Sequence, residues 1–216
     1  MQRSDFYCEY KAARNKAWEI IIKYEVNTLP VSVRALCRRM GICLFKYTEG
    51  ARLIEKYKLH KYLKNDGFST IIQNNYIVFY DETKPVSRIR FTIAHEIGHI
   101  VLKHLLYQNI ACRHFVTDWN AEGAAAPNPL ETAANIFASR LLAPACVLWK
   151  LNIHSAEEIE TLCGLSRQAA QIRAQRMERL YLLNRFNQSP LEKKTLQQFS
   201  GFIEEYQKAH TLQNNI

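Results

Sequence analysis

The chain has 216 residues, 48% of them hydrophobic and 23% charged, which is enough for a sizeable core and typical of a soluble globular protein. Its formal net charge of +9 fits a nucleic-acid partner and fits a basic solvated surface equally well. The first twenty residues carry charges throughout, so we expect no signal peptide, and no apolar run approaches membrane length. The 6 cysteines form no C-x-x-C pair, which predicts reduced thiols and a cytoplasmic protein.

Apolar spacing and turn residues predict the first elements of the chain. They are a helix over 5–25, a short helix over 32–40 that stops at Gly41, a strand over 42–47 and a basic helix over 49–64. A β-hairpin follows, with strands over 68–73 and 76–81 joined by Asn74 and Asn75, which tolerate positive φ. The edge of this hairpin could pair with an extended peptide. Pro85 then suits the first turn of a long helix that runs to about Leu106.

That long helix contains His95-Glu96-Ile97-Gly98-His99, which has the form H-E-x-x-H. Residues four apart share one helix face, so both histidines can direct a ring nitrogen at one metal ion. Glu96 is the next residue around the helix and can act as a base toward water. The surrounding positions are apolar on nearly all sides, so the helix is expected to be buried, and buried His and Glu need partners. We therefore predict a metal site rather than an exposed polar face.

The second half of the chain is predicted to be helical after a long aperiodic loop over 107–127. Four helices are expected. The first begins at Asn128 and ends before Pro144, and the second begins at the capping box of Ser155 and ends at Gly164. The third runs over 166–184, and the fourth begins at Ser189. The last is expected to carry one apolar stripe of Leu196, Phe199, Ile203 and Tyr206. The predicted class is α+β, mainly helical, with a small antiparallel sheet next to the H-E-x-x-H helix.

A third metal ligand is needed, because catalytic zinc usually has three protein ligands and a water. His104 lies five residues after His99 and is expected to point away from that face. Glu131 lies far enough along the chain for an antiparallel helix to return to the motif, and Asn135 one turn later could hydrogen-bond a ligand. Glu131 also stands at the third helical position after Asn128, where it would complete a capping box. Periodicity alone leaves both interpretations open.

A donor that stabilises the oxyanion is also required in peptide hydrolysis. Four residues are conceivable, and the sequence does not choose among them: Tyr76, Tyr80, Arg90 and His114.

The two halves of the motif together resemble the ImmA/IrrE family of metallo-endopeptidases. The family pattern is close to H-E-[IL]-G-H followed by E-x-E-A-N-x-F-A-x-x-L-L-M-P, and this chain has HEIGH at 95–99 and ETAANIFASRLLAP at 131–144. The flanks at 88–92 and 163–170 are similar too, so the resemblance spans roughly residues 15–185. Ala133 and Ala143 stand where the family often has a second acid and Met. Related zincins use the first acid, which is Glu131 here.

The resemblance implies zinc held by His95, His99 and Glu131, with Glu96 catalytic. It implies a zincin-like peptidase domain over 1–150 and a helical region over 151–216 packed on it. It further implies a cytoplasmic hydrolase that cleaves a helix-turn-helix repressor and so relieves repression of mobile-element or stress-response genes.

Two other functions fit the sequence. Residues 155–184 could form a helix-turn-helix that touches DNA through Arg167, Arg173, Arg176 and Arg179, which would make the protein a non-enzymatic zinc-binding regulator. A basic helix on the surface of an enzyme explains the same residues and is favoured. A toxin–antitoxin component that binds its repressor partner is the second alternative. No membrane partner is expected, and the oligomeric state is open.

Overall fold

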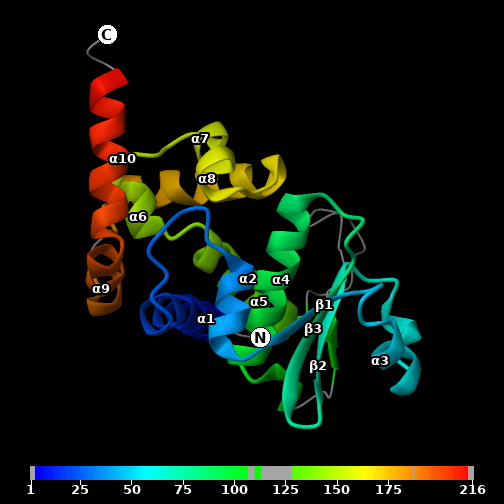
Figure 1. Ribbon diagram of the computed structural model, residues 1–216. Helices are drawn as coiled ribbons and strands as arrows, with labels where there is room; N and C mark the ends of the chain where they lie inside the picture. The colour runs from blue at the N-terminus through cyan, green and yellow to red at the C-terminus, as the bar shows by residue number, and fades with distance from the viewer. Residues whose placement is uncertain (1–2, 107–109, 113–127, 187, 214–216) are drawn as a thin grey trace. The chain divides into compact units, whose positions relative to one another are not determined.

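The computed structural model describes residues 3–106, 110–112, 128–186 and 188–213, and it divides into two compact units (Figure 1). Unit 1 consists of Met1–Ala13 and Val33–Ala138, and unit 2 consists of Arg14–Ser32 and Ser139–Ile216. Both units are therefore assembled from two separate stretches of chain. The expected domain boundary at residue 150 stays a prediction.

The described elements confirm the α+β class. The helices are α1 (Arg3–Lys23), α2 (Val33–Met40), α3 (Ala51–Lys56), α4 (Val86–Val101), α5 (Pro129–Leu142), α6 (Ala145–Lys150), α7 (Ala156–Cys163), α8 (Arg167–Leu182), α9 (Pro190–Gln198) and α10 (Ser200–Gln213), with short 3-10 helices η1 (His60–Tyr62) and η2 (His104–Leu106). The strands are β1 (Cys43–Lys46), β2 (Gly67–Ile72), β3 (Asn75–Tyr80) and β4 (Ile110–Cys112).

Unit 1 contains a four-stranded sheet in the order β1-β3-β2-β4. The sheet is mixed rather than antiparallel as expected, because β1 pairs with β3 in parallel. The predicted hairpin is present, but its turn is Gln73-Asn74, with φ of 49° and 63°, one residue earlier than expected. The hairpin also has no open edge along Phe68–Thr70, since β4 pairs with β2 there and β1 pairs with β3. The expectation that the hairpin itself offers a peptide-binding edge is therefore wrong over these residues.

Strand alternation gives the hairpin two different faces. One face contributes Phe68, Ile72, Ile77 and Phe79 to an apolar cluster that includes Ile54 and Leu59. The rings of Phe68 and Phe79 stack at 4.9 Å between centroids in this cluster. The other face packs against α4, where a Cβ on Gly67 would lie 2.6 Å from Cγ2 of Thr92. Ser69, two residues along the same face, is consequently directed at the middle of α4, where its hydroxyl donates to Glu96.

The position of α4 is fixed at its start and along its length. The guanidinium of Arg88 donates to both carboxylate oxygens of Asp66, at 2.6 and 2.9 Å, which ties the first turn of α4 to the residue before β2. Residues 92–100 of the helix are all buried. Gly98 lies against α5, since a Cβ there would be 3.1 Å from the ring of Phe137 and 3.2 Å from Cα of Ala134. The two helices that carry the motifs therefore pack with their backbones close together at Gly98.

Two helices of unit 1 are shorter than predicted, for the same physical reason. The helix expected over 49–64 ends at Lys56, where Lys58 takes a φ of 55°, and the helix expected to reach Leu106 ends at Val101, where Lys103 takes a φ of 63°. In each case the left-handed residue turns the chain so that the next apolar side chain becomes buried. Leu59 is 5% exposed and Leu105 is 2% exposed. Burial of these leucines outweighs the helical propensity of the sequence around them.

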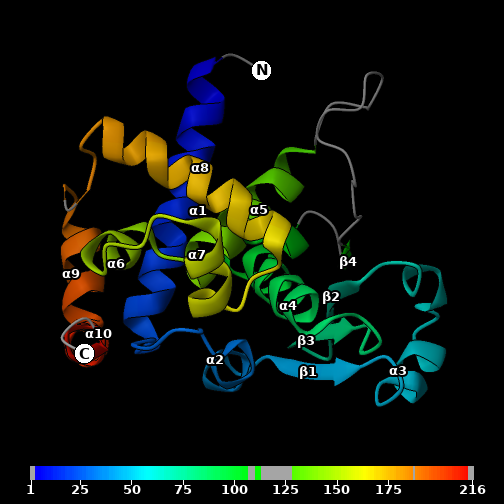
Figure 2. The ribbon, with the colours of Figure 1, turned by 90° about the horizontal axis from the view of Figure 1, so that it is seen from above.

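Unit 2 is made of helices, most of which begin and end where the sequence predicts. The capping boxes at Ser155 and Ser189 are both formed, and Gly164 ends α7 with a φ of 61°. The helix α6 was not predicted, and the last predicted helix is two helices, α9 and α10, which meet at Phe199 (Figure 2). Phe199 is 0% exposed, so the bend buries it, and the expected single stripe is divided between two helices.

One expectation about apolar stretches was also wrong. The 22 residues of Pro129–Lys150 are long and apolar enough to cross a membrane by length and composition. However, 67% of the most apolar window is buried inside the protein. A core helix passes the same test, because internal helices are apolar on all sides.

The contact at Gly98 can be tested with a matched pair of glycines. Gly98→Ala should lower the free energy of unfolding by about 1–2 kcal/mol, because overpacking against the backbone of Ala134 exceeds the gain in helix propensity. Gly201→Ala should instead raise it by about 0.5–1 kcal/mol, because nothing lies within 4 Å of its added Cβ. Urea denaturation of both variants measures this, and an equal gain in stability for both would show that α4 and α5 are not in such close contact.

Candidate metal centre

Three side chains from α4 and α5 converge on one point. Nε2 of His95 lies 2.9 Å from Nε2 of His99, and the carboxylate oxygens of Glu131 lie 3.1 Å and 3.3 Å from these two nitrogens. One ligand atom from each residue lies within 4.8 Å of the others, so the group could hold a metal ion. Two imidazoles and a carboxylate are a donor set typical of first-row metals. The chemistry of the residues present thus fits a catalytic metal.

The helices account for this geometry. His95 and His99 are one turn apart on α4 and are 0% and 1% exposed. Glu131 is the third residue of α5, whose first turn is capped by Asn128 through a 2.9 Å bond from the backbone N–H of Leu130. The carboxylate of Glu131 extends to the two imidazoles. Of the two interpretations that the sequence leaves open, this geometry favours the ligand over the capping box.

The electrostatics of the group show that it attracts positive charge. Burial raises the pKa of Glu131, but hydrogen bonds from His95 and His99 and the charges of both rings outweigh it and hold that pKa far below its ordinary value. For His99, burial lowers the pKa, while the hydrogen bond to Glu131 and the charges of Glu96 and Glu131 raise it above its ordinary value. The carboxylates that stabilise a protonated imidazole would stabilise a metal cation at the same point.

Further polar side chains contact the histidines and Glu96. Oδ1 of Asn135 lies 2.9 Å from Nδ1 of His95, as the spacing on α5 suggested. The hydroxyl of Ser69 donates to Oε2 of Glu96 at 2.6 Å, and Nδ1 of His104 lies 2.9 Å from Nδ1 of His99. Ser69 and His104 were missed. Ser69 and Thr70 are polar residues inside an otherwise apolar strand, which was the available signal for Ser69. The turn at Lys103 brings His104 to Nδ1 of His99, on the side of that ring away from the ligand group.

Of the four oxyanion candidates, three lie in the described residues. Tyr80 is 1% exposed, and its hydroxyl accepts a 2.7 Å hydrogen bond from Arg34. Tyr76 is exposed and Arg90 is partly exposed, and both stay predictions. His114 lies outside the described residues.

A comparison with protein families decides the type of protein. The family model described as the IrrE N-terminal-like domain, a peptidase family, matches residues 50–175, more than half of the chain. The chain belongs to this family. The match covers α4, α5 and strands β2, β3 and β4, so the resemblance read from the two motifs is confirmed, and the protein is of the ImmA/IrrE metallopeptidase type with a protein as its class of substrate. No curated protein matches the chain.

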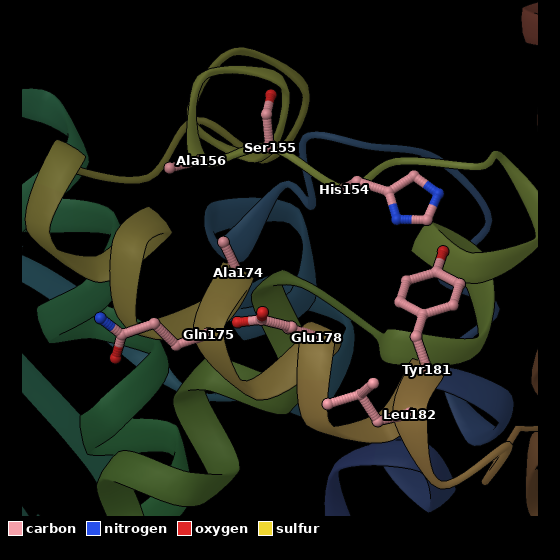
Figure 3. Close-up of a pocket in the computed structure, with 8 residues that line it drawn as sticks. All are labelled: His154, Ser155, Ala156, Ala174, Gln175, Glu178, Tyr181 and Leu182. Carbon is pink, nitrogen blue, oxygen red and sulfur yellow. The ribbon is translucent and has the colours of Figure 1, made fainter.

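Unit 2 also contains a hollow. A groove of about 440 Å³ lies between the start of α7 and the exposed side of α8 (Figure 3). His154 and Tyr181 stack at one end of it, with ring centroids 4.3 Å apart. It contains none of the metal-binding candidates, so chemistry rather than concavity locates the site.

The role of Glu131 can be separated from helix capping by a matched variant. Glu131→Ala should weaken metal binding by more than about 100-fold, because loss of a ligand should exceed the effect of losing a partner that only hydrogen-bonds to one. Glu158→Ala removes the same position of a true capping box in α7, and should cost on the order of 1 kcal/mol of stability with metal binding unchanged. Metal content and thermal unfolding of both variants measure this. Normal metal binding by Glu131→Ala would return Glu131 to a capping role.

Proposed function

We propose that this protein is a zinc-dependent endopeptidase that cleaves a specific cytoplasmic protein, a helix-turn-helix transcriptional repressor. Cleavage would relieve repression of mobile-element or stress-response genes. The observation that carries the enzymatic part is the convergence of His95, His99 and Glu131, with the buried carboxylate of Glu96 on the same turn of α4. The repressor as substrate and the cytoplasmic location rest on the family type and on the free thiols of the described cysteines.

His95, His99 and Glu131 would hold the zinc. When bound, zinc supplies Lewis acidity, which polarises the scissile carbonyl and makes water a stronger acid. Because two imidazoles are neutral and one carboxylate carries a single negative charge, the site with zinc bound would keep a net positive charge. Asn135 keeps the His95 ring oriented by occupying its other nitrogen.

Glu96 is the proposed general base. It takes a proton from the attacking water and passes it to the nitrogen of the leaving amine. Ser69 donates to Oε2 of Glu96 and so fixes the plane of the carboxylate from the sheet side. Both side chains are 0% exposed, which keeps bulk water from competing for these hydrogen bonds.

The DNA-binding alternative loses support in unit 2. Arg173 of α8 is 1% exposed, and its guanidinium donates to the carbonyl oxygen of Ala143, so this arginine acts inside the protein. Arg167 pairs with Glu157 at 2.7 Å. Two of the four arginines expected to face DNA are therefore engaged within the unit, and no observation favours a regulator or a toxin–antitoxin component over the peptidase.

Zinc content tests the metal assignment. The wild type, purified without chelators, should contain about one zinc per chain, and His99→Ala should contain almost none, because only two donors remain. Elemental analysis measures both, and exposed His60→Ala serves as the histidine control. Full zinc occupancy in His99→Ala would contradict the assignment.

Glu96→Gln tests the chemistry separately from binding. Gln is nearly isosteric with Glu but cannot accept the proton, so zinc and repressor binding should persist while cleavage falls by about 10²–10⁴-fold. The assay mixes the protein with a helix-turn-helix repressor encoded beside it and looks for discrete fragments.

Cleavage by Glu96→Gln at the wild-type rate would exclude Glu96 as the base. If the zinc-loaded wild type bound the repressor, released it from DNA and never cut it, the non-enzymatic regulator would be the better explanation.

A further inference from the structure

His99 has a partner at each of its two ring nitrogens. Nε2 faces His95 and Glu131, and Nδ1 lies 2.9 Å from Nδ1 of His104. We propose that His104 is a positioning residue, which accepts a hydrogen bond from His99 and thereby fixes the His99 tautomer that can bind metal. This inference rests on the proposed metal site and adds a residue that neither motif contains.

The contact between His99 and His104 contains one shared proton, whose position defines the donor and the acceptor. Two nitrogens 2.9 Å apart can share one hydrogen, so one of them donates and the other accepts. His99 must keep the lone pair of Nε2 available for a metal, so its proton must be on Nδ1. Nδ1 of His104 is then the acceptor, and the proton of His104 is on Nε2. One contact therefore sets the tautomers of both rings.

The backbone holds His104 in place for this contact. α4 ends at Val101, and Lys103 adopts a φ of 63°, which turns the chain so that η2 begins at His104. The His104 residue is 6% exposed and meets the His99 ring edge to face, with centroids 4.9 Å apart and planes at 75°. A buried ring in a fixed orientation loses little freedom when it forms the hydrogen bond.

His104 is not an alternative third ligand. Its contact is with the ring nitrogen of His99 that points away from the ligand group, and the convergent group in the described residues is His95, His99 and Glu131. Its place in the site is equivalent to that of Asn135, which contacts Nδ1 of His95 at 2.9 Å. Each histidine ligand is thus oriented by a neutral side chain rather than by a carboxylate.

Zinc affinity tests the proposal in the full chain. Competition with a chromophoric chelator should show about 10–100-fold weaker zinc binding for His104→Ala. His104→Asn should recover much of the affinity, because its Oδ1 can replace Nδ1 as the acceptor. His60→Ala, at an exposed histidine, should bind zinc as the wild type does. Nitrogen NMR of the wild type should show His104 protonated at Nε2 and His99 at Nδ1.

The outcomes separate this inference from the proposed function. If the wild type binds zinc and His104→Ala binds it equally well, the positioning role is wrong and the metal site stands. If the wild type binds no zinc, both are wrong. Should His104→Ala fail to fold, the NMR experiment on the wild type decides, since a proton on Nδ1 of His104 would overturn the inference.

Discussion

The close approach of α4 and α5 at Gly98 is the constraint on which the candidate site depends. His95 and His99 belong to one helix, so their separation is fixed by helix geometry alone. Glu131 belongs to the other helix, and its carboxylate reaches the imidazoles only because the two backbones meet where residue 98 has no side chain. The glycine in the H-E-x-x-H segment is therefore part of the candidate metal site, although it offers no ligand. A larger residue there would move the third donor while leaving the motif itself intact.

The sheet makes a second, independent contribution to the same site. Its alternation sends Phe68 and Ile72 to an apolar cluster and Ser69 to α4, so one strand both builds a core and delivers a hydroxyl to Glu96. A shift of one residue in the pairing of β2 would move Ser69 to the apolar face and bring a large side chain against α4. The tight fit of Gly67 against Thr92 opposes such a shift. Glu96, the proposed base, is thus positioned by a helix and a strand rather than by a loop.

The sequence was sufficient for the parts of the site that follow from local spacing. The helical face of His95 and His99, the return of Glu131 and the contact of Asn135 all depend on periods of three and four residues. Ser69 and His104 could not be found in this way, because the first depends on strand register and the second on a left-handed residue at Lys103. The dependence on tertiary contacts also explains why three helix ends were predicted wrongly. Where Leu59, Leu105 and Phe199 are buried at a bend, tertiary burial decides the boundary, and local propensity gives no sign of it.

Several polar residues of the candidate site contact one another inside an apolar helix contact. His95, Glu96, His99 and His104 are each at most 6% exposed, and a buried polar group without a partner costs about 1–3 kcal/mol. The described contacts give each ring a partner at a defined nitrogen, and they give Glu96 the hydroxyl of Ser69. Such a network permits few proton arrangements, because each shared hydrogen fixes the donor and acceptor on the next ring. In the arrangement proposed for His99 and His104, the proton of His99 is on Nδ1, and the lone pair of its Nε2 stays directed at the ligand group.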